Sequence, residues 1–468
     1  MNRKWMLLAL PATALAVAAA FSIPPVASQS TLLSDRDGDR TRARDPGVRG
    51  GTAGAGAPLD GLTENELRFF ERGKEDFNDE ERVRDGLGPR MNLDSCGGCH
   101  AQPAIGGTSP ALNPQVAFAS KFGGTDFVPP FVLIDGPVRE ARFVRNADGT
   151  PDGGVHALFT ITGWSGADGC NILQPDFARQ MANRNVIFRI PTPVFGAGLI
   201  EQIPDNAILA NRDAQGARKR DLGIRGRANF RVAGRAISGQ TNNNGNDGTI
   251  SRFGWKAQNV SMLLFSGEAY NVEMGITNEL FQNERDLTPE CQFNTVPNDT
   301  QDLDATDALA ATPAIQHFAN FQRFLAPPVP VADTPGGGES IARGRNLFDA
   351  VGCALCHTPS LPTAANSTVA ALRGKVANLY SDLLVHDMGV GLADGVSQGQ
   401  AGPREFRSAP LWGLGQRIFF LHDGRTSDLV QAIRQHRSEG SEAYRVVNNY
   451  DNLRESLKQD LLNFLRSL

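Results

Sequence analysis

The stretch that decides the fold is residues 341–357, IARGRNLFDAVGCALCH, which ends on Cys353, Cys356 and His357. Apolar residues recur at helical spacing before this CxxCH motif, so we expect a helix that leads into it. The two thiols of such a motif can add to the two vinyl groups of a haem from one turn of chain, and the adjoining histidine then reaches the iron. Cys353 and Cys356 are therefore predicted to bind haem c covalently, with His357 as an axial ligand.

A second copy of this arrangement lies earlier in the chain and ends on Cys96, Cys99 and His100. The helical segment before it carries Arg-Gly-Lys at 72–74, which parallels Arg-Gly-Arg at 343–345. This earlier copy has an insertion, residues 78–95, between helix and motif. We interpret the repeat as an internal duplication and predict a second haem c, held by Cys96 and Cys99 with His100 as its axial ligand.

Composition divides the rest of the chain. A Pro- and Gly-rich linker at 326–338 separates an N-terminal haem domain, 63–325, from a C-terminal electron-transfer cytochrome c domain, 339–468. We expect a mainly α fold with two cytochrome c-like haem domains, the N-terminal one enlarged by an insertion with short β-strands and long loops. Short runs rich in β-branched and aromatic residues predict these strands at 127–134, 157–162 and 186–190.

The N-terminus predicts export. Two basic residues, an apolar stretch and a small-residue run resemble a signal peptide, residues 1–28, and a flexible linker rich in Gly, Arg and Asp follows at 29–62. No later segment is apolar enough to span a membrane, so we expect a periplasmic protein without a membrane span after cleavage. The net charge of −5 argues against a nucleic-acid partner.

Two cysteines, Cys170 and Cys291, lie outside the CxxCH motifs. An oxidising compartment would allow them to form a disulfide. Two free buried thiols are the alternative.

Several segments carry a resemblance to a known family. FRSAPLWGLG at 406–415 and FLHDGR at 420–425 look like the C-terminal haem domain of bacterial di-haem cytochrome c peroxidases. Together with GLGPRMN at 86–92 before the first motif, they most resemble the di-haem oxidoreductase branch. The resemblance covers most of residues 63–468.

The resemblance implies a second axial ligand for the C-terminal haem. In these peroxidases this ligand, usually Met, lies fourteen residues beyond the histidine of an HxG motif, and here that count runs from His422 to His436. Met388 is the alternative ligand. His386 and His422 are then expected to bond within loops or to haem propionates. Replacement of Met by His should lower the reduction potential.

The resemblance also implies two residues near the first haem. Trp255 matches the inter-haem tryptophan, and Glu273 matches the distal catalytic glutamate, which could act as a general acid–base group on bound peroxide. The alternatives are a core tryptophan and a solvated glutamate.

Two departures from the family pattern change what we expect. Val116 stands where relatives have a distal histidine, so the first iron is expected to be open unless a remote residue such as His156 caps it. Arg417 and Phe419 replace the Thr-x-Pro of the relatives' calcium site, so calcium is not supported.

The expected function is that of a peroxidase. The chain would reduce hydrogen peroxide, or another small oxidant, with electrons from a small periplasmic donor relayed through the C-terminal haem. The alternatives are a non-catalytic electron-transfer cytochrome and a di-haem oxidase or dioxygenase acting on an organic or protein substrate.

Overall fold

The structure is a computed structural model that describes residues 42–230, 236–237, 240–241, 249–299 and 312–468. The predicted signal peptide and the first part of the predicted linker lie outside these residues. The described part is mainly helical with a few small sheets, as expected. None of its helices is long and apolar enough to cross a membrane.

Two helix pairs repeat the duplication seen in the sequence. Helix α1 (Glu64–Asn78) packs on α9 (Ala314–Phe324), and α10 (Gly338–Val351) packs on α14 (Glu455–Ser467). A Cβ on Gly73 would lie 2.2 Å from the backbone oxygen of His317, and one on Gly344 would lie 2.0 Å from that of Asp460. Both helix crossings therefore require the glycine of the repeated Arg-Gly sequence.

Aromatic contacts continue the repeat toward each motif. Phe77 of α1 lies 5.8 Å from the His100 ring, and Phe348 of α10 lies 6.5 Å from the His357 ring, both measured between ring centroids. The partner helices contribute Phe321 and Phe464, whose rings contact Phe77 and Phe348. The two CxxCH motifs are thus supported by equivalent helix pairs, α1 with α9 and α10 with α14.

Helix α8 (Met262–Met274) packs on α9. Ser261 caps its start, since its hydroxyl accepts a hydrogen bond from the Leu264 N–H group. Gly275 ends it with φ +76°, a conformation that favours glycine. Most of the helix is buried, and Glu273, in its last turn, is partly buried.

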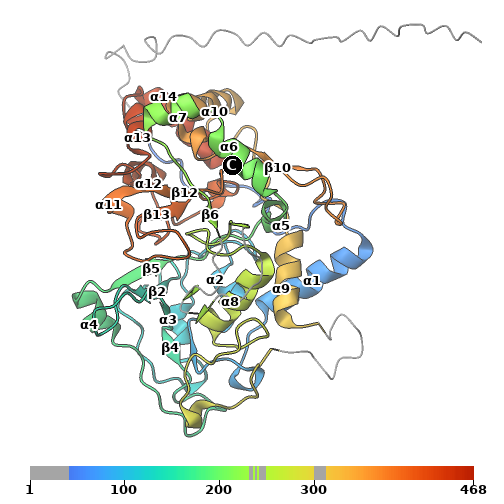
Figure 1. Ribbon diagram of the computed structural model, residues 1–468, viewed down its shortest axis with the longest axis vertical. Coiled ribbons are helices and arrows are strands. Elements are labelled where there is room, and N and C mark those ends of the chain that lie inside the picture. Colours follow the sequence, from blue (N-terminus) through green and yellow to red (C-terminus); the bar gives the residue numbers. More distant parts are fainter. Residues whose placement is uncertain (1–41, 231–235, 238–239, 242–248, 300–311) are drawn as a thin grey trace, which may run out of the picture.

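The strands β2, β4 and β5 lie at the end of the molecule away from the C-terminal helices, whereas β10, β12 and β13 lie nearer those helices (Figure 1). The largest sheet has the antiparallel order β3–β2–β5, in which Ala141 pairs with both His156 and Phe188. Residues 127–134 form turns rather than the predicted strand, since Pro129 and Pro130 cannot donate ladder hydrogen bonds. The strands of the described chain are β1 (Arg90–Met91), β2 (Glu140–Phe143), β3 (Val155–His156), β4 (Phe159–Thr160), β5 (Val186–Arg189), β6 (Asn229–Phe230), β7 (Ala236–Ile237), β8 (Gln240–Thr241), β9 (Ile250–Ser251), β10 (Leu361–Pro362), β11 (Val376–Ala377), β12 (Val385–Asp387) and β13 (Glu405–Arg407).

Part of the region 115–255 packs on the second motif rather than the first. Leu222, at the end of α7, and Ile224 contact a cluster that contains Leu355 and Cys353. Figure 1 shows α6 and α7 beside the C-terminal helices, far from α4. The remaining described helices are α2 (Cys96–Cys99), α3 (Gln115–Phe118), α4 (Phe177–Ala182), α5 (Ala197–Glu201), α6 (Asp205–Asp213), α7 (Gly216–Leu222), α11 (Gly389–Leu392), α12 (Leu429–Gln435) and α13 (Tyr444–Asp451).

The described part of the predicted flexible linker, residues 42–62, is held against the protein. Asp45 forms an ion pair of 2.6 Å with Arg466, and both side chains are buried. The Ala43 N–H group also bonds to Glu455. The segment offers little apolar surface to bury, so composition predicted a flexible linker, but these polar contacts anchor its described part. Elsewhere, Cys170 and Cys291 form a disulfide across 121 residues of sequence.

Candidate functional site

The first CxxCH motif opens into a cavity, called cavity 1, whose empty space including its mouth is about 1130 Å³. The motif forms a single helical turn, α2, because the Ser95 hydroxyl accepts a hydrogen bond from the Gly98 N–H group at 3.2 Å. A side chain on Gly98 would collide with Leu93. The walls of cavity 1 bring together Cys96, Cys99, His100, Trp255 and Glu273.

The His100 ring is prepared for metal binding. Its Nδ1–H donates to the backbone oxygen of Gly107 at 2.9 Å, which leaves the lone pair on Nε2. Burial lowers the pKa of His100 to about 4, so the imidazole stays neutral at physiological pH. A neutral, oriented imidazole is what an iron ligand requires.

The second motif opens into cavity 2, whose empty space including its mouth is about 1390 Å³. Its walls are largely apolar, with Leu392, Phe406 and Leu411 among them. The predicted residues that line it are Cys353, Cys356, His357, His436, Met388 and Trp255.

Two histidines of cavity 2 are oriented in the same way. The Nδ1–H of His357 donates to the Tyr380 backbone oxygen at 3.1 Å, and that of His436 donates to the Ala432 backbone oxygen at 2.8 Å. Burial lowers the pKa of His357 to about 4, and the nearby His436 lowers it further. Burial also lowers the pKa of His436. Both rings therefore keep a neutral Nε2 at the lining of cavity 2, and a pair of imidazoles is a donor set that suits iron.

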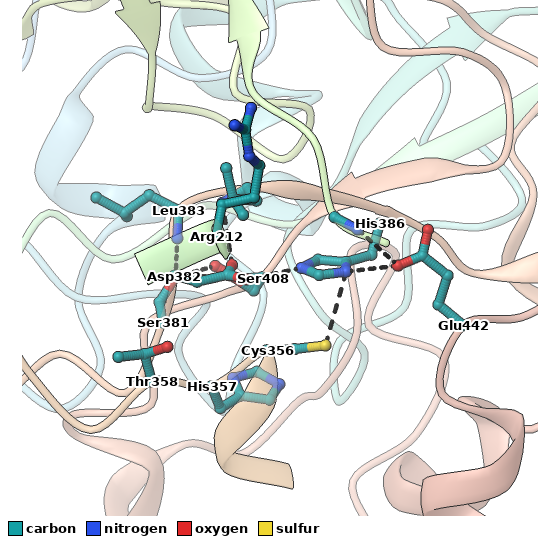
Figure 2. A network of polar contacts seen from close by, with 12 residues as sticks. Arg212, Cys356, His357, Thr358, Ser381, Asp382, Leu383, His386, Ser408 and Glu442 are labelled. Atoms are coloured by element: carbon teal, nitrogen blue, oxygen red, sulfur yellow. Dashed lines mark hydrogen bonds and ion pairs between the residues drawn. The ribbon is translucent and has the colours of Figure 1, made fainter. Parts of the chain in front are cut away.

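His386 has a different role. Figure 2 shows its ring between the carboxylates of Asp382 and Glu442, which it contacts at 3.0 and 2.8 Å, with the Cys356 sulfur 3.6 Å away. Burial alone lowers the pKa of His386, but the Cys356 sulfur and the Asp382 carboxylate together raise it well above its ordinary value. Because both ring nitrogens are engaged by acids, His386 bonds within the loops, as expected.

The Glu273 carboxyl, partly buried in the wall of cavity 1, is paired with a second carboxyl group. Its Oε2 accepts a hydrogen bond of 2.6 Å from the Asn92 amide, and its side chain also bonds to Glu140 of β2. Burial and the Glu140 charge raise the pKa of Glu273 well above its ordinary value. The Arg142 guanidinium, 2.5 Å from Glu140, helps to hold the pKa of Glu140 low despite burial. The pair therefore shares one proton, and that proton resides on Glu273.

Trp255 lines both cavities. Its indole N–H donates to the Ile190 backbone oxygen at 2.9 Å, which fixes the ring. On the side of cavity 2 it contacts the His422 ring edge-on, and His422 stacks on Phe406 with 4.3 Å between centroids. The indole therefore forms part of the wall between the two cavities.

The residues present fit two haem c groups. The four motif cysteines are free of disulfides, and each pair lies in one cavity with an oriented histidine beside it. Burial raises the pKa of Cys96 and of Cys353 to about 12, so both are neutral thiols at physiological pH.

Sequence reasoning missed Glu140, Arg142 and Asn92. These residues lie far from Glu273 along the chain, and only the packing of β2 and of the segment before α2 on α8 brings them together. The sole signal was the E-A-R sequence at 140–142, which is too common to indicate a site.

The sequence profile of the family described as "Di-haem oxidoreductase, putative peroxidase" matches residues 171–468. No curated protein matches the chain. Among solved structures, a Kuenenia stuttgartiensis hydrazine synthase aligns with this chain at 18% identity and a TM-score of 0.23. The alignment covers 34% of this chain and 56%, or about half, of the synthase chain. A MauG-like protein associated with microbial copper homeostasis aligns at 15% identity over 57% of this chain and 89% of its own, with a TM-score of 0.28. Because the family match covers more than half of its length, the chain belongs to the di-haem oxidoreductase family.

Proposed function

We propose that the chain is an exported, periplasmic di-haem c peroxidase that reduces hydrogen peroxide to water with electrons from a small periplasmic donor protein. The observation that carries this proposal is the difference between the two cavities. Among the described lining residues, cavity 1 combines His100 with a partly buried carboxyl pair that shares a proton, whereas cavity 2 contains the oriented histidines His357 and His436.

Each cavity would hold one haem c. When bound, a haem supplies an iron that exchanges electrons one at a time and whose reactivity depends on its axial ligands. The residues that would hold the haem of cavity 1 are Cys96, Cys99 and His100, and those for cavity 2 are Cys353, Cys356, His357 and His436.

The carboxyl pair would handle the protons. Reduction of peroxide follows H2O2 + 2H⁺ + 2e⁻ → 2H2O. The O–O bond breaks, and each of the two oxygens needs one further proton to become water. Glu273 carries a proton that it can donate to the leaving oxygen, and the pair can then accept one again. Glu273 and Glu140 together can thus act as both acid and base.

Two neighbours keep the proton where it is needed. Asn92 donates to Glu273 and orients its carboxyl group. Arg142 stabilises the charge of Glu140 and so directs the shared proton to Glu273. Both are positioning residues, since they act through the two glutamates.

Cavity 2 would serve electron transfer. An iron with two histidine ligands has no open position for a substrate, so this site would pass electrons and not bind peroxide. Trp255, in the wall shared with cavity 1, would lie on the path between the two sites.

The Glu273→Gln variant tests the proposal. Glutamine keeps the size of the side chain and removes its proton, so peroxide turnover should fall by about 10²–10⁴-fold while the visible spectra of both haems stay unchanged. Glu71→Gln, at an exposed position of α1, is the matched control. Turnover equal to that of the control would remove Glu273 from the mechanism.

The electron-carrier alternative requires a second protein ligand in cavity 1. Among the described residues that line this cavity, His100 is the only histidine, and His156 instead stacks on Phe143 and bonds to Asp152. Met274 also lines the cavity and is a candidate ligand. We expect Met274→Leu to leave the first haem high-spin; conversion from low-spin to high-spin would favour the carrier.

A further inference from the structure

Two arginines line cavity 2 from different parts of the fold. Arg407 ends strand β13, and Arg417 follows a short turn of 3-10 helix at Leu414–Gln416. Each of these two arginine residues is only 8% exposed. Arg407 donates one hydrogen bond, from Nε to the Gly254 backbone oxygen at 2.9 Å.

Neither guanidinium is matched by an acid in the described part of the chain. Burial lowers the pKa of Arg417 to about 10, and burial together with the Arg417 charge lowers that of Arg407 to about 10. Two other buried arginines have a carboxylate at 2.6 Å: Arg189 pairs with Asp394, and Arg466 pairs with Asp45. The buried Arg49 also has no carboxylate partner among the described residues, but only Arg407 and Arg417 line cavity 2.

The acid that lines cavity 2 is already engaged. Glu442 accepts hydrogen bonds from the backbone N–H groups of Arg225 and Gly226 and contacts His386 at 2.8 Å. In addition, the buried hydroxyl of Tyr450, which also lines this cavity, has no hydrogen-bond partner among the described residues. Among the described residues, cavity 2 thus offers unused cationic and polar donors and no free carboxylate to match them.

Buried charges without partners are unfavourable, so the complete site must contain anionic groups. A guanidinium binds a carboxylate through paired N–H donors, and a haem carries two propionate carboxylates. We propose that Arg407 and Arg417 form an anion-binding end of cavity 2 that holds the carboxylates of the haem attached to Cys353 and Cys356, and that they raise its reduction potential. This inference rests on the proposed haem in cavity 2 but not on peroxide as the substrate.

The electrostatic consequence follows from the sign of the charge. A nearby buried cation stabilises the reduced iron more than the oxidised iron, because the reduced iron carries one positive charge less. Low polarity around the site strengthens this effect. A second histidine in place of methionine acts in the opposite direction, since it lowers the potential. The two arginines would offset this and keep the haem of cavity 2 able to accept electrons from a donor.

The test uses the full-length protein with its haems, in the absence of peroxide. Potentials are measured by spectroelectrochemical titration of the low-spin haem in Arg407→Gln, Arg417→Gln and the charge-conserving Arg417→Lys. Each Gln variant should lower the ratio of reduced to oxidised haem at a fixed applied potential at least tenfold, a shift of 59 mV for one electron. Arg417→Lys should retain most of the wild-type potential, and Arg345→Gln, exposed on α10, should not change it.

Unchanged potentials in both Gln variants with two haems bound would overturn the inference. Selective loss of the haem at Cys353 and Cys356, measured as haem content per chain, would support the carboxylate-binding role. If the Gln variants fail to fold, the Arg417→Lys variant provides the test. We expect its resonance Raman propionate band to differ from that of the wild type. An identical band would overturn the inference. A protein without peroxide turnover would still show these shifts, so failure of the proposed function is recognised separately.

Discussion

Gly344→Ala tests the packing that supports the second motif. The added Cβ would lie 2.0 Å from the Asp460 backbone oxygen and 2.6 Å from the Phe464 Cβ, far inside normal contact. Neither atom can rotate away, because one belongs to the backbone and the other is fixed to it. Helix α10 must therefore move away from α14, which also displaces Phe348 from His357.

The expected magnitude combines two opposing effects. Overpacking of this kind costs about 1–3 kcal/mol, and the backbone collision places it at or above the upper end. Alanine in place of glycine returns at most about 1 kcal/mol of helix propensity. We expect a net loss of about 2 kcal/mol, which corresponds to a fall of about 4–8 °C in the melting temperature of a domain of 150–250 residues.

The assay is thermal unfolding of the haem-loaded protein, followed by circular dichroism in the visible haem bands. Gly338→Ala is the matched control in the same helix, because its Cβ would meet only the Ala332 backbone oxygen at an ordinary 3.4 Å. The control should be neutral or slightly stabilising. Equal melting temperatures for Gly344→Ala and Gly338→Ala would refute the argument that glycine permits the helix crossing.

Three further predictions follow from the same contacts. Replacement of both Cys170 and Cys291 by Ala should cost about 5 kcal/mol of unfolding free energy, since the disulfide closes a loop of 121 residues, and a denaturant midpoint equal to that of the wild type would contradict this. Burial raises the pKa of Glu81 from 4.5 to about 7, so the folded state binds this proton more tightly and stability falls as pH rises between these values. Glu81→Gln should therefore stabilise the protein at pH 8 and not at pH 4. Equal effects on the unfolding free energy at both pH values would contradict this prediction. His436→Ala should turn the second haem high-spin in its visible spectrum, whereas the same change in Met388→Ala would identify Met388 as the ligand.

The features that could be predicted from the sequence are local. The helices before each motif follow from apolar spacing, and the repeated Arg-Gly sequence marks both helix crossings. The placement of Trp255 and Glu273 at cavity 1 came from the resemblance to the peroxidases and not from their own neighbourhood in the sequence.

The features that escaped prediction depend on distant segments. Glu140 meets Glu273 only after β2 packs beside α8, and no pattern along the chain encodes that approach. Arg417 was noted only as a departure from a calcium site, since its burial in cavity 2 is a property of the folded state. The position of α7 on the second motif was missed because the strand-like runs that precede it suggested an insertion confined to the first domain.

The most direct test of the central claim is an electron paramagnetic resonance spectrum of the fully oxidised protein before and after addition of hydrogen peroxide. The account predicts one high-spin ferric haem in cavity 1 and one low-spin ferric haem in cavity 2, with the high-spin signal consumed by peroxide. Two low-spin haems that do not respond to peroxide, before or after partial reduction, would contradict a peroxidase with an open first site.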